Sequence, residues 1–252
     1  MRGSLLCVFL WMGCESGPTW AQVEEMNTIE GYEAFLATEP DQFLLPTIEK
    51  HLEGLYFNRA ATADVAAAWD VYAARFPKGG ANGPLATKKR MDAHYREAMA
   101  ADDADKLETF AKAFPKSGWN GARAGGRAAA LRFGKIGLTE PVVTPVNMAE
   151  DPKGTPDGRG VTVDVTNGGD QALEFVGMTL FYLGDDGTEL SVQDYALTQP
   201  TWDLPASDEQ MKPLGAGETR AWKWSIGDEY APKGWNGKVR VLCTGLRPIT
   251  PK

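Results

Sequence analysis

Two histidines are the first candidates for chemistry, because imidazole can bind a metal or transfer a proton. His51 and His94 are the only histidines in this chain of 252 residues. A zinc site needs three or four convergent nitrogen or sulfur ligands, and neither residue has another histidine or a cysteine three or four positions away. We therefore interpret both as helix-surface residues and expect neither a metal nor a cofactor.

Two acidic clusters could suggest calcium, but each fits a structural role. Asp185-Asp186-Gly187 lacks the alternating oxygen ligands and distal glutamate of a calcium loop, and Asp-Gly is typical of a hairpin turn. Asp102-Asp103-Ala104-Asp105 precedes a helical stretch, where carboxylates complement the helix dipole. The sequence contains no Gly-rich phosphate loop and no Gly-x-Ser-x-Gly nucleophile motif. It therefore predicts a protein that is not an enzyme.

Cys14 is a candidate for modification because of the residues before it. Arg2 is followed by an apolar run from Leu5 to Met12, which ends at Gly13-Cys14. This run is too short to span a bilayer, which takes about 20 residues, whereas positive, then apolar, then small is typical of a secretory signal. The pattern resembles the lipobox of bacterial lipoproteins, although Trp11 stands where that family prefers leucine. The resemblance implies cleavage before Cys14 and acylation of its thiol.

The resemblance predicts a signal peptide over residues 1–13 and a lipid-anchored tether over 14–26, on a membrane-anchored lipoprotein of the bacterial cell envelope. A second possibility is cleavage after Ala21, which also follows the signal pattern. The protein would then be periplasmic or secreted. Cys243 is the one cysteine that follows both possible cleavage points. We therefore expect no disulfide framework, and we expect Cys243 to be a buried structural thiol.

A repeated spacing of aromatic residues and prolines predicts paired helices. Phe35, Tyr72 and Phe110 each lie five residues before a proline, in steps of 37 and 38 residues. In the second copy, Val65, Ala68, Trp69, Tyr72 and Phe76 fall on one face of an α-helix. Each copy continues with a second helical stretch, the third of which is weakened by Gly125-Gly126. A helix pair of this kind cannot bury its apolar face alone, so the sequence predicts a solenoid over residues 27–138.

The helix ends at Tyr72–Pro77 and Phe110–Pro115 resemble those of tetratricopeptide-type repeat lipoproteins of the bacterial envelope. This resemblance implies a helical-repeat domain that binds a partner protein. The steps of 37 and 38 residues differ from that family's period of about 34.

A second domain follows a proline-rich segment. Four prolines predict a linker over residues 139–159, after which the apolar period changes from helical to alternating. The alternating segments are 161–165, 219–225 and 239–243, and a longer strand is expected at 173–183. They predict an antiparallel β-sandwich over residues 160–252. The expected fold class is therefore α + β as separate domains, a tetratricopeptide-like solenoid followed by a β-sandwich.

The sandwich segment also resembles a known family. Val163–Asn167, Leu180–Tyr182, Asp186-Gly187 and Leu214–Glu218 follow one another as in the small immunoglobulin-like envelope domains of the FxLYD kind. A long insertion at 190–213 departs from that pattern. The resemblance implies an immunoglobulin-like fold and no catalytic residues.

Charge is unevenly distributed along the chain. The net charge of −8 argues against nucleic acid, whose binding requires clustered Lys and Arg. Residues 71–140 nevertheless hold thirteen Lys/Arg against seven Asp/Glu. Stacked repeats would place basic second helices side by side, and the residues that we predict to bind an acidic partner are Lys88, Lys89, Arg90, Arg123 and Arg127. The alternative is an ordinary solvated surface.

The sequence as a whole predicts a membrane-tethered interaction or scaffold module of the bacterial cell envelope, whose partner is another envelope protein. The alternative function is carbohydrate binding by aromatic rings of the sandwich. The residues that would form such a platform are Trp202, Trp222, Trp224 and Trp235.

Overall fold

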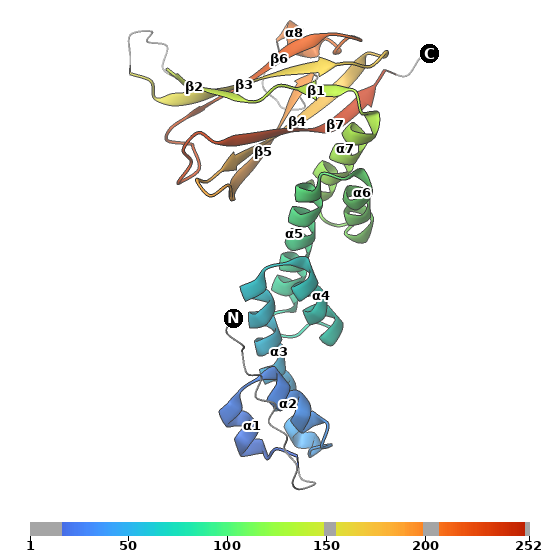
Figure 1. The fold of residues 1–252 in the computed structure, drawn as a ribbon, viewed down its shortest axis with the longest axis vertical. Coiled ribbons are helices and arrows are strands. Elements are labelled where there is room, and N and C mark those ends of the chain that lie inside the picture. Colours follow the sequence, from blue (N-terminus) through green and yellow to red (C-terminus); the bar gives the residue numbers. More distant parts are fainter. Residues whose placement is uncertain (1–16, 149–154, 199–206, 250–252) are drawn as a thin grey trace, which may run out of the picture. The chain divides into compact units, whose positions relative to one another are not determined.

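The computed structural model describes residues 17–148, 155–198 and 207–249. Helices come first and antiparallel strands follow, so the mixed α and β composition predicted from the sequence is confirmed (Figure 1). The chain divides into two compact units, residues 1–93 and 94–252. In the described part of the chain, no helix is both long and apolar enough to span a membrane. The predicted signal peptide and Cys14 lie outside the described residues.

The first unit is built from paired helices. These elements are α1 (Trp20–Met26), α2 (Ile29–Leu36), the 3-10 turn η1 (Gln42–Leu44), α3 (Leu45–Ala63), α4 (Ala66–Arg75) and the first part of α5 (Gly83–Ala101). The hydroxyl of Thr28 begins α2 by accepting the Gly31 amide at 3.1 Å. Helix α1 occupies the last part of the predicted tether, residues 14–26. Its Val23 is fully buried in one cluster with residues of α2 and α3.

The aromatic residues of the repeat lie inside these pairs. Tyr32 and Phe35 are buried in one cluster, and Trp69 and Tyr72 are buried in a second. The expected apolar faces are therefore confirmed at these positions. Val65 is an exception, because it is the N-cap of α4 and is 46% exposed. The helix begins one residue later than the spacing predicts.

The second unit contains the last residues of α5 together with the elements that follow. The helices are α6 (Ala104–Ala113), α7 (Trp119–Phe133) and α8 (Asp208–Met211). The strands are β1 (Ile136–Leu138), β2 (Val142–Val146), β3 (Gly158–Asn167), β4 (Leu173–Leu183), β5 (Glu189–Thr198), β6 (Thr219–Gly227) and β7 (Val239–Pro248).

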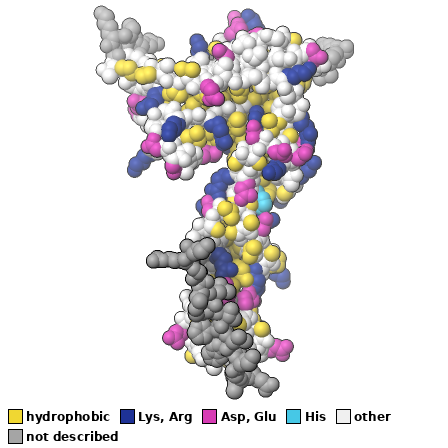
Figure 2. All heavy atoms as spheres, viewed as in Figure 1, with side chains coloured by type: hydrophobic (Ala, Val, Ile, Leu, Met, Phe, Trp, Pro, Cys, Tyr) yellow, Lys and Arg dark blue, Asp and Glu magenta, His cyan; other side chains and the backbone are white. Residues whose placement is uncertain are grey.

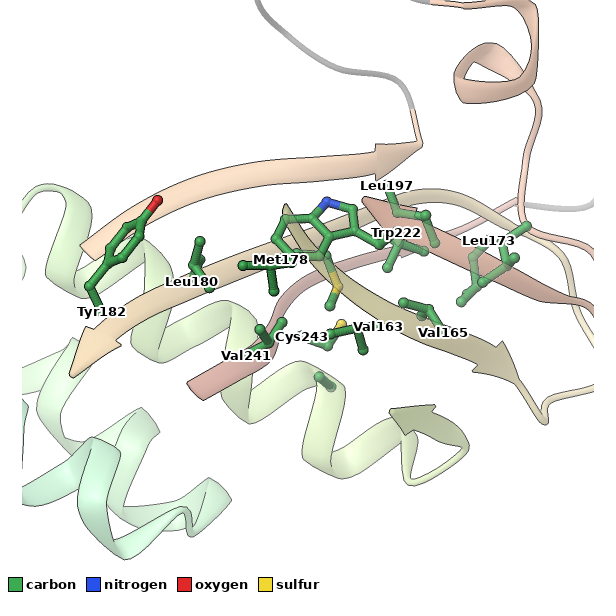
Figure 3. Packing of buried hydrophobic residues seen from close by; sticks show 14 of the residues in the cluster. Val163, Val165, Leu173, Met178, Leu180, Tyr182, Leu197, Trp222, Val241 and Cys243 are labelled. Atoms are coloured by element: carbon green, nitrogen blue, oxygen red, sulfur yellow. The ribbon is translucent and has the colours of Figure 1, made fainter. Parts of the chain in front are cut away.

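The strands form two antiparallel sheets. Strand β3 is central in one sheet, with β1 and β2 paired to successive stretches of it and β6 paired along its length. Strand β4 is central in the other, between β5 and β7. Figure 3 shows Val163 and Val165 of β3 and Trp222 of β6 packed with Met178 of β4 in one core. Cys243 is a buried free thiol in this core, as the sequence predicts.

Three strands lie where the sequence predicts none. Strand β1 occupies the end of the predicted solenoid and pairs with β3. Strand β2 occupies part of the predicted linker and pairs with β3 from Val142–Thr162 to Val146–Gly158. It is an outer strand, which can contain Pro145 because a missing N–H costs least at a sheet edge. Strand β5 begins just before the predicted insertion and lies mostly within it, paired with β4. Its sequence lacks the strict alternation that marks a strand with one exposed face.

Candidate functional site at the helix–sheet junction

The residues predicted to bind a partner lie in both units. Lys88 and Lys89 are exposed on α5 in the first unit, and within the described residues neither forms an ion pair. Arg90 donates from Nε to Asp70 Oδ1 at 2.6 Å. Arg123 and Arg127 lie on α7 in the second unit, and each is held by a carboxylate. The three arginines of the predicted surface therefore serve as internal contacts.

Arg123 joins α7 to the sheet through a largely buried pair. Its Nε lies 2.8 and 2.9 Å from the two carboxylate oxygens of Asp194 on β5, and its second nitrogen lies 2.8 Å from Oδ2. The two side chains are 15% and 25% exposed. Burial alone would lower the pKa of Arg123, but the hydrogen-bonded carboxylate of Asp194 outweighs it and raises the pKa. The planar guanidinium suits this two-oxygen contact.

Hydroxyl groups from the two neighbouring strands complete this junction. Thr179 on β4 donates to Asp194 Oδ1 at 2.7 Å. Its hydroxyl oxygen also lies 2.6 Å from that of Thr244 on β7. One carboxylate is thus held by a cation from α7 and a hydroxyl from the central strand, so all three strands of this sheet contribute to the junction.

Arg127 fixes the same helix to the turn before α6. Its Nε and terminal nitrogen lie 2.6 and 2.7 Å from the two carboxylate oxygens of Asp102. These hydrogen bonds lower the pKa of Asp102. Asp103, the next residue, caps α6 by accepting the Lys106 amide at 3.0 Å. The structural role expected for this acidic cluster is therefore confirmed at Asp103, whereas Asp102 binds an arginine.

Glycine and alanine residues allow α7 to approach the backbone of β7. A Cβ on Gly126 would lie 1.6 Å from the carbonyl oxygen of Thr244. Ala130, one turn after Gly126 on the same face of the helix, is 4% exposed and packs in the core of the two sheets. The glycine pair that weakens α7 as an isolated helix is therefore what lets it dock on the sheet.

A second group of buried polar atoms borders this contact. The Tyr95 hydroxyl and Arg240 Nε are buried, and neither has a hydrogen-bond partner among the described residues. Arg240 lies over the Phe181 ring at 4.4 Å, and its terminal nitrogen is 4.0 Å from Glu189 Oε2. Burial raises the pKa of Glu189, although Arg240 opposes this effect. Burial also raises the pKa of Tyr95 to about 12, so its phenol stays protonated at neutral pH.

This arrangement is suited to holding elements together. Its carboxylates are bound to guanidinium groups, and its hydroxyls are bound to a carboxylate or to each other. Sequence reasoning missed Asp194, Thr179 and Tyr95, because no motif links residues so far apart in the chain.

The first unit contains a buried carboxylate that the sequence did not reveal. Glu53 of α3 is 5% exposed and accepts the Tyr72 hydroxyl at 2.5 Å. It also accepts the backbone amide and the side-chain amide of Asn82, each at 3.1 Å, just before α5 begins. Burial, and then the contact with Glu53, raises the pKa of Tyr72. This contact joins α3, α4 and the start of α5.

The other predicted chemistry-bearing residues have packing roles. His51 stacks on Tyr32 with ring centroids 5.3 Å apart, and His94 lies 5.1 Å from Phe114. Among the described residues, no group of three or more His, Cys, Asp or Glu is placed to hold a metal ion. Asp186 accepts the Thr188 amide at 2.9 Å, and Gly187 has a φ of 81°, so the predicted hairpin turn is confirmed.

The described tryptophans of the predicted carbohydrate platform pack against tyrosine rings. Trp222 is 4% exposed, and Trp224 lies against Tyr195 with centroids 4.0 Å apart. Trp235 packs edge-on against Tyr182 at 5.0 Å, and Trp202 lies outside the described residues. A sugar platform needs an exposed ring face, and these described rings favour packing instead.

Comparisons with known proteins leave the family open. No family model matches the chain, and no curated protein matches it. Solved structures with partial similarity include target SoR45 of the Northeast Structural Genomics Consortium, at 10% identity, with 46% of this chain and 85% of that chain covered and a TM-score of 0.25. Another is the Pseudomonas fluorescens alkylpurine DNA glycosylase AlkC, bound to DNA containing an abasic site analog. It is 15% identical, with 66% of this chain and 51% of that chain covered and a TM-score of 0.29. Scores this low carry no argument about fold or activity.

Proposed function

We propose that this protein is a membrane-tethered interaction module of the bacterial cell envelope and not an enzyme. Its first unit would be a tetratricopeptide-like solenoid that docks another envelope protein. Its two-sheet part would be an immunoglobulin-like sandwich that serves as a spacer or second contact. A lipid on Cys14 would hold the chain at the membrane.

One observation carries the interaction function. Several basic residues of the helical part are bound to carboxylates within the chain, including Arg75, Arg90, Arg123 and Arg127. Lys88 and Lys89 are exposed neighbours without an ion pair among the described residues. Two adjacent cations with no internal partner can attract an acidic protein, and salt would weaken that attraction.

Reversing these two lysines tests the proposal. The full chain carrying Lys88→Glu and Lys89→Glu would be compared with wild type by crosslinking in its native cell, followed by mass spectrometry of captured proteins. A matched control carries Lys50→Glu and Lys116→Glu, which change the net charge equally at exposed positions. We expect the first variant alone to lose a captured protein, and high salt to weaken capture by wild type. Equal capture by all three proteins would contradict the proposed function.

The anchor is tested separately by mass spectrometry of the mature N-terminus. We expect an acylated Cys14, since two or more long acyl chains anchor a protein stably to a membrane. A mature chain that begins at Gln22 would show that the protein is exported without the lipid.

A further inference from the structure

Helix α4 has an apolar face toward solvent. Ala67, Val71 and Ala74 are exposed and lie four and three residues apart, so they share one side of the helix. Val71 is 52% exposed. The opposite side is apolar as well, because Trp69 and Tyr72 are buried there. We call Ala67, Val71 and Ala74 the α4 face. A surface helix of a soluble protein is normally polar on its outer side, so the exposure of this apolar face to solvent has to be explained.

The other repeats provide an internal comparison. When Phe35, Tyr72 and Phe110 are aligned, the positions equivalent to the α4 face are exposed in all three repeats. In the first repeat they are Glu30, Ala34 and Ala37, and in the third they are Asp105, Thr109 and Lys112. The second repeat is the one that has no polar side chain at these positions. The repeat architecture therefore does not itself require an apolar outer face.

Positive charge lies beside the α4 face. Asp70, next to Val71, accepts the Nε of Arg90 at 2.6 Å, which joins this edge of α4 to α5, and Lys89 is the residue before Arg90. Lys78 follows α4 and is exposed, and within the described part it has no ion pair. Figure 2 shows apolar side chains at the surface of this helical region with Lys and Arg side chains close by.

We infer that the α4 face binds an acidic amphipathic helix of the partner protein. The two alanines on either side of Val71 would let the apolar side of that helix approach closely, and its acidic residues would face Lys78 and Lys89. A second copy of this chain fits less well, because it would bring the same lysines toward each other. The inference rests on the proposed interaction function and adds the chemistry of the partner.

Synthetic peptides test the inference on the full chain. The probe is a labelled helical peptide of about 18 residues, long enough for five turns, with Leu and Ala on one side and Glu on the other. One control peptide has the same composition in scrambled order, and another has Lys in place of Glu. Binding is measured by fluorescence anisotropy, and sedimentation of the protein alone reports its oligomeric state.

We expect the acidic amphipathic peptide to bind wild type, and Val71→Asp to weaken binding by at least about ten-fold. The matched control is Thr109→Asp, at the equivalent exposed position of the third repeat, and it should bind as wild type does. Circular dichroism checks that both variants are folded.

The inference is overturned if the peptide does not bind, if Val71→Asp binds it equally, or if the scrambled or basic peptide binds as well. A wild-type dimer that Val71→Asp dissociates would also overturn it, since a second copy would then cover the face. Loss of native capture on reversing Lys88 and Lys89 is an independent result, so failure here leaves the proposed function to be judged by that experiment.

Discussion

Arg123 and Arg132 show how the solvent exposure of an ion pair determines its contribution to the stability of the fold. Both lie on α7 and both bind carboxylates at hydrogen-bonding distance. The side chain of Arg123 is 15% exposed, whereas that of Arg132 is 52% exposed. Solvent screens an exposed pair, but a buried carboxylate that loses its cation has no substitute. The two residues therefore form a matched pair for measuring what the junction contributes.

We predict that Arg123→Ala destabilises the second unit by about 3 kcal/mol, because Asp194 would remain buried without a cation. Arg132→Ala should change the free energy of unfolding little. Urea unfolding of both variants, followed by circular dichroism, measures the difference. Similar midpoints for the two variants would show that the buried pair contributes no more than a surface pair.

Glu189, whose side chain is 34% exposed, lets the effect of partial burial on a carboxylate be tested by pH. Its folded-state pKa is raised, so ionisation costs the folded protein stability above that pKa, and the cost disappears as pH falls below the ordinary value. Glu189→Gln should therefore raise the urea midpoint at about pH 7 and lose this advantage toward about pH 4. The exposed Glu229→Gln is the control and should shift neither midpoint. An advantage for Glu189→Gln that is independent of pH would reject the proposed cause.

At the level of the element, α7 combines two adjacent glycines with opposite surroundings. A Cβ on Gly125 meets nothing within 4 Å, whereas one on Gly126 meets the Thr244 carbonyl oxygen at 1.6 Å. Alanine is the better helix former at either position. Gly125→Ala would thus stabilise the helix, whereas Gly126→Ala would prevent its docking on β7.

We predict that Gly125→Ala stabilises the protein by about 0.5–1 kcal/mol, the difference in helix propensity. Gly126→Ala should destabilise it by about 2 kcal/mol or more, because the backbone of α7 must move away from β7. Thermal unfolding of the two variants measures both effects. If Gly126→Ala is as stable as Gly125→Ala, the close approach of α7 to β7 is not required.

The same elements show how far a sequence can predict this fold. The helices of the first two repeats and strands β3, β6 and β7 have a periodic apolar pattern, because each buries one defined face, whereas β4 is a nearly continuous apolar run that is buried along most of its length. Strand β5 lacks that signal, since its burial does not alternate. The junction was beyond prediction because Arg123 and Asp194 lie 71 residues apart and neither has a local motif. The sequence identifies Arg123 as one of a group of basic residues, but it could not show that Arg123 forms an ion pair with Asp194.

At the level of the whole molecule, the compact units divide the chain at a different place from the change of period. The sequence predicts domains over 27–138 and 160–252, whereas the structure divides at residues 93 and 94. The third helix pair belongs with the sheets, since α7 docks on β7 and Arg123 reaches Asp194. The short strands β1 and β2 also pair with β3. A fragment that starts at the change of period would lose all of these contacts.

We predict that residues 83–252, which retain the whole of α5, unfold in one cooperative thermal transition, and that residues 158–252 do not. The shorter fragment would leave one edge of β3 without its paired strands, and unpaired strand edges favour association. It would also expose Phe181 and Asp194 on the sheet that α7 covers, and Asp194 would have no cation. Calorimetry and sedimentation of both fragments distinguish the two divisions. A monomeric 158–252 fragment with a cooperative transition at the same temperature would show that the sheets fold without the third helix pair, as the change of period predicts.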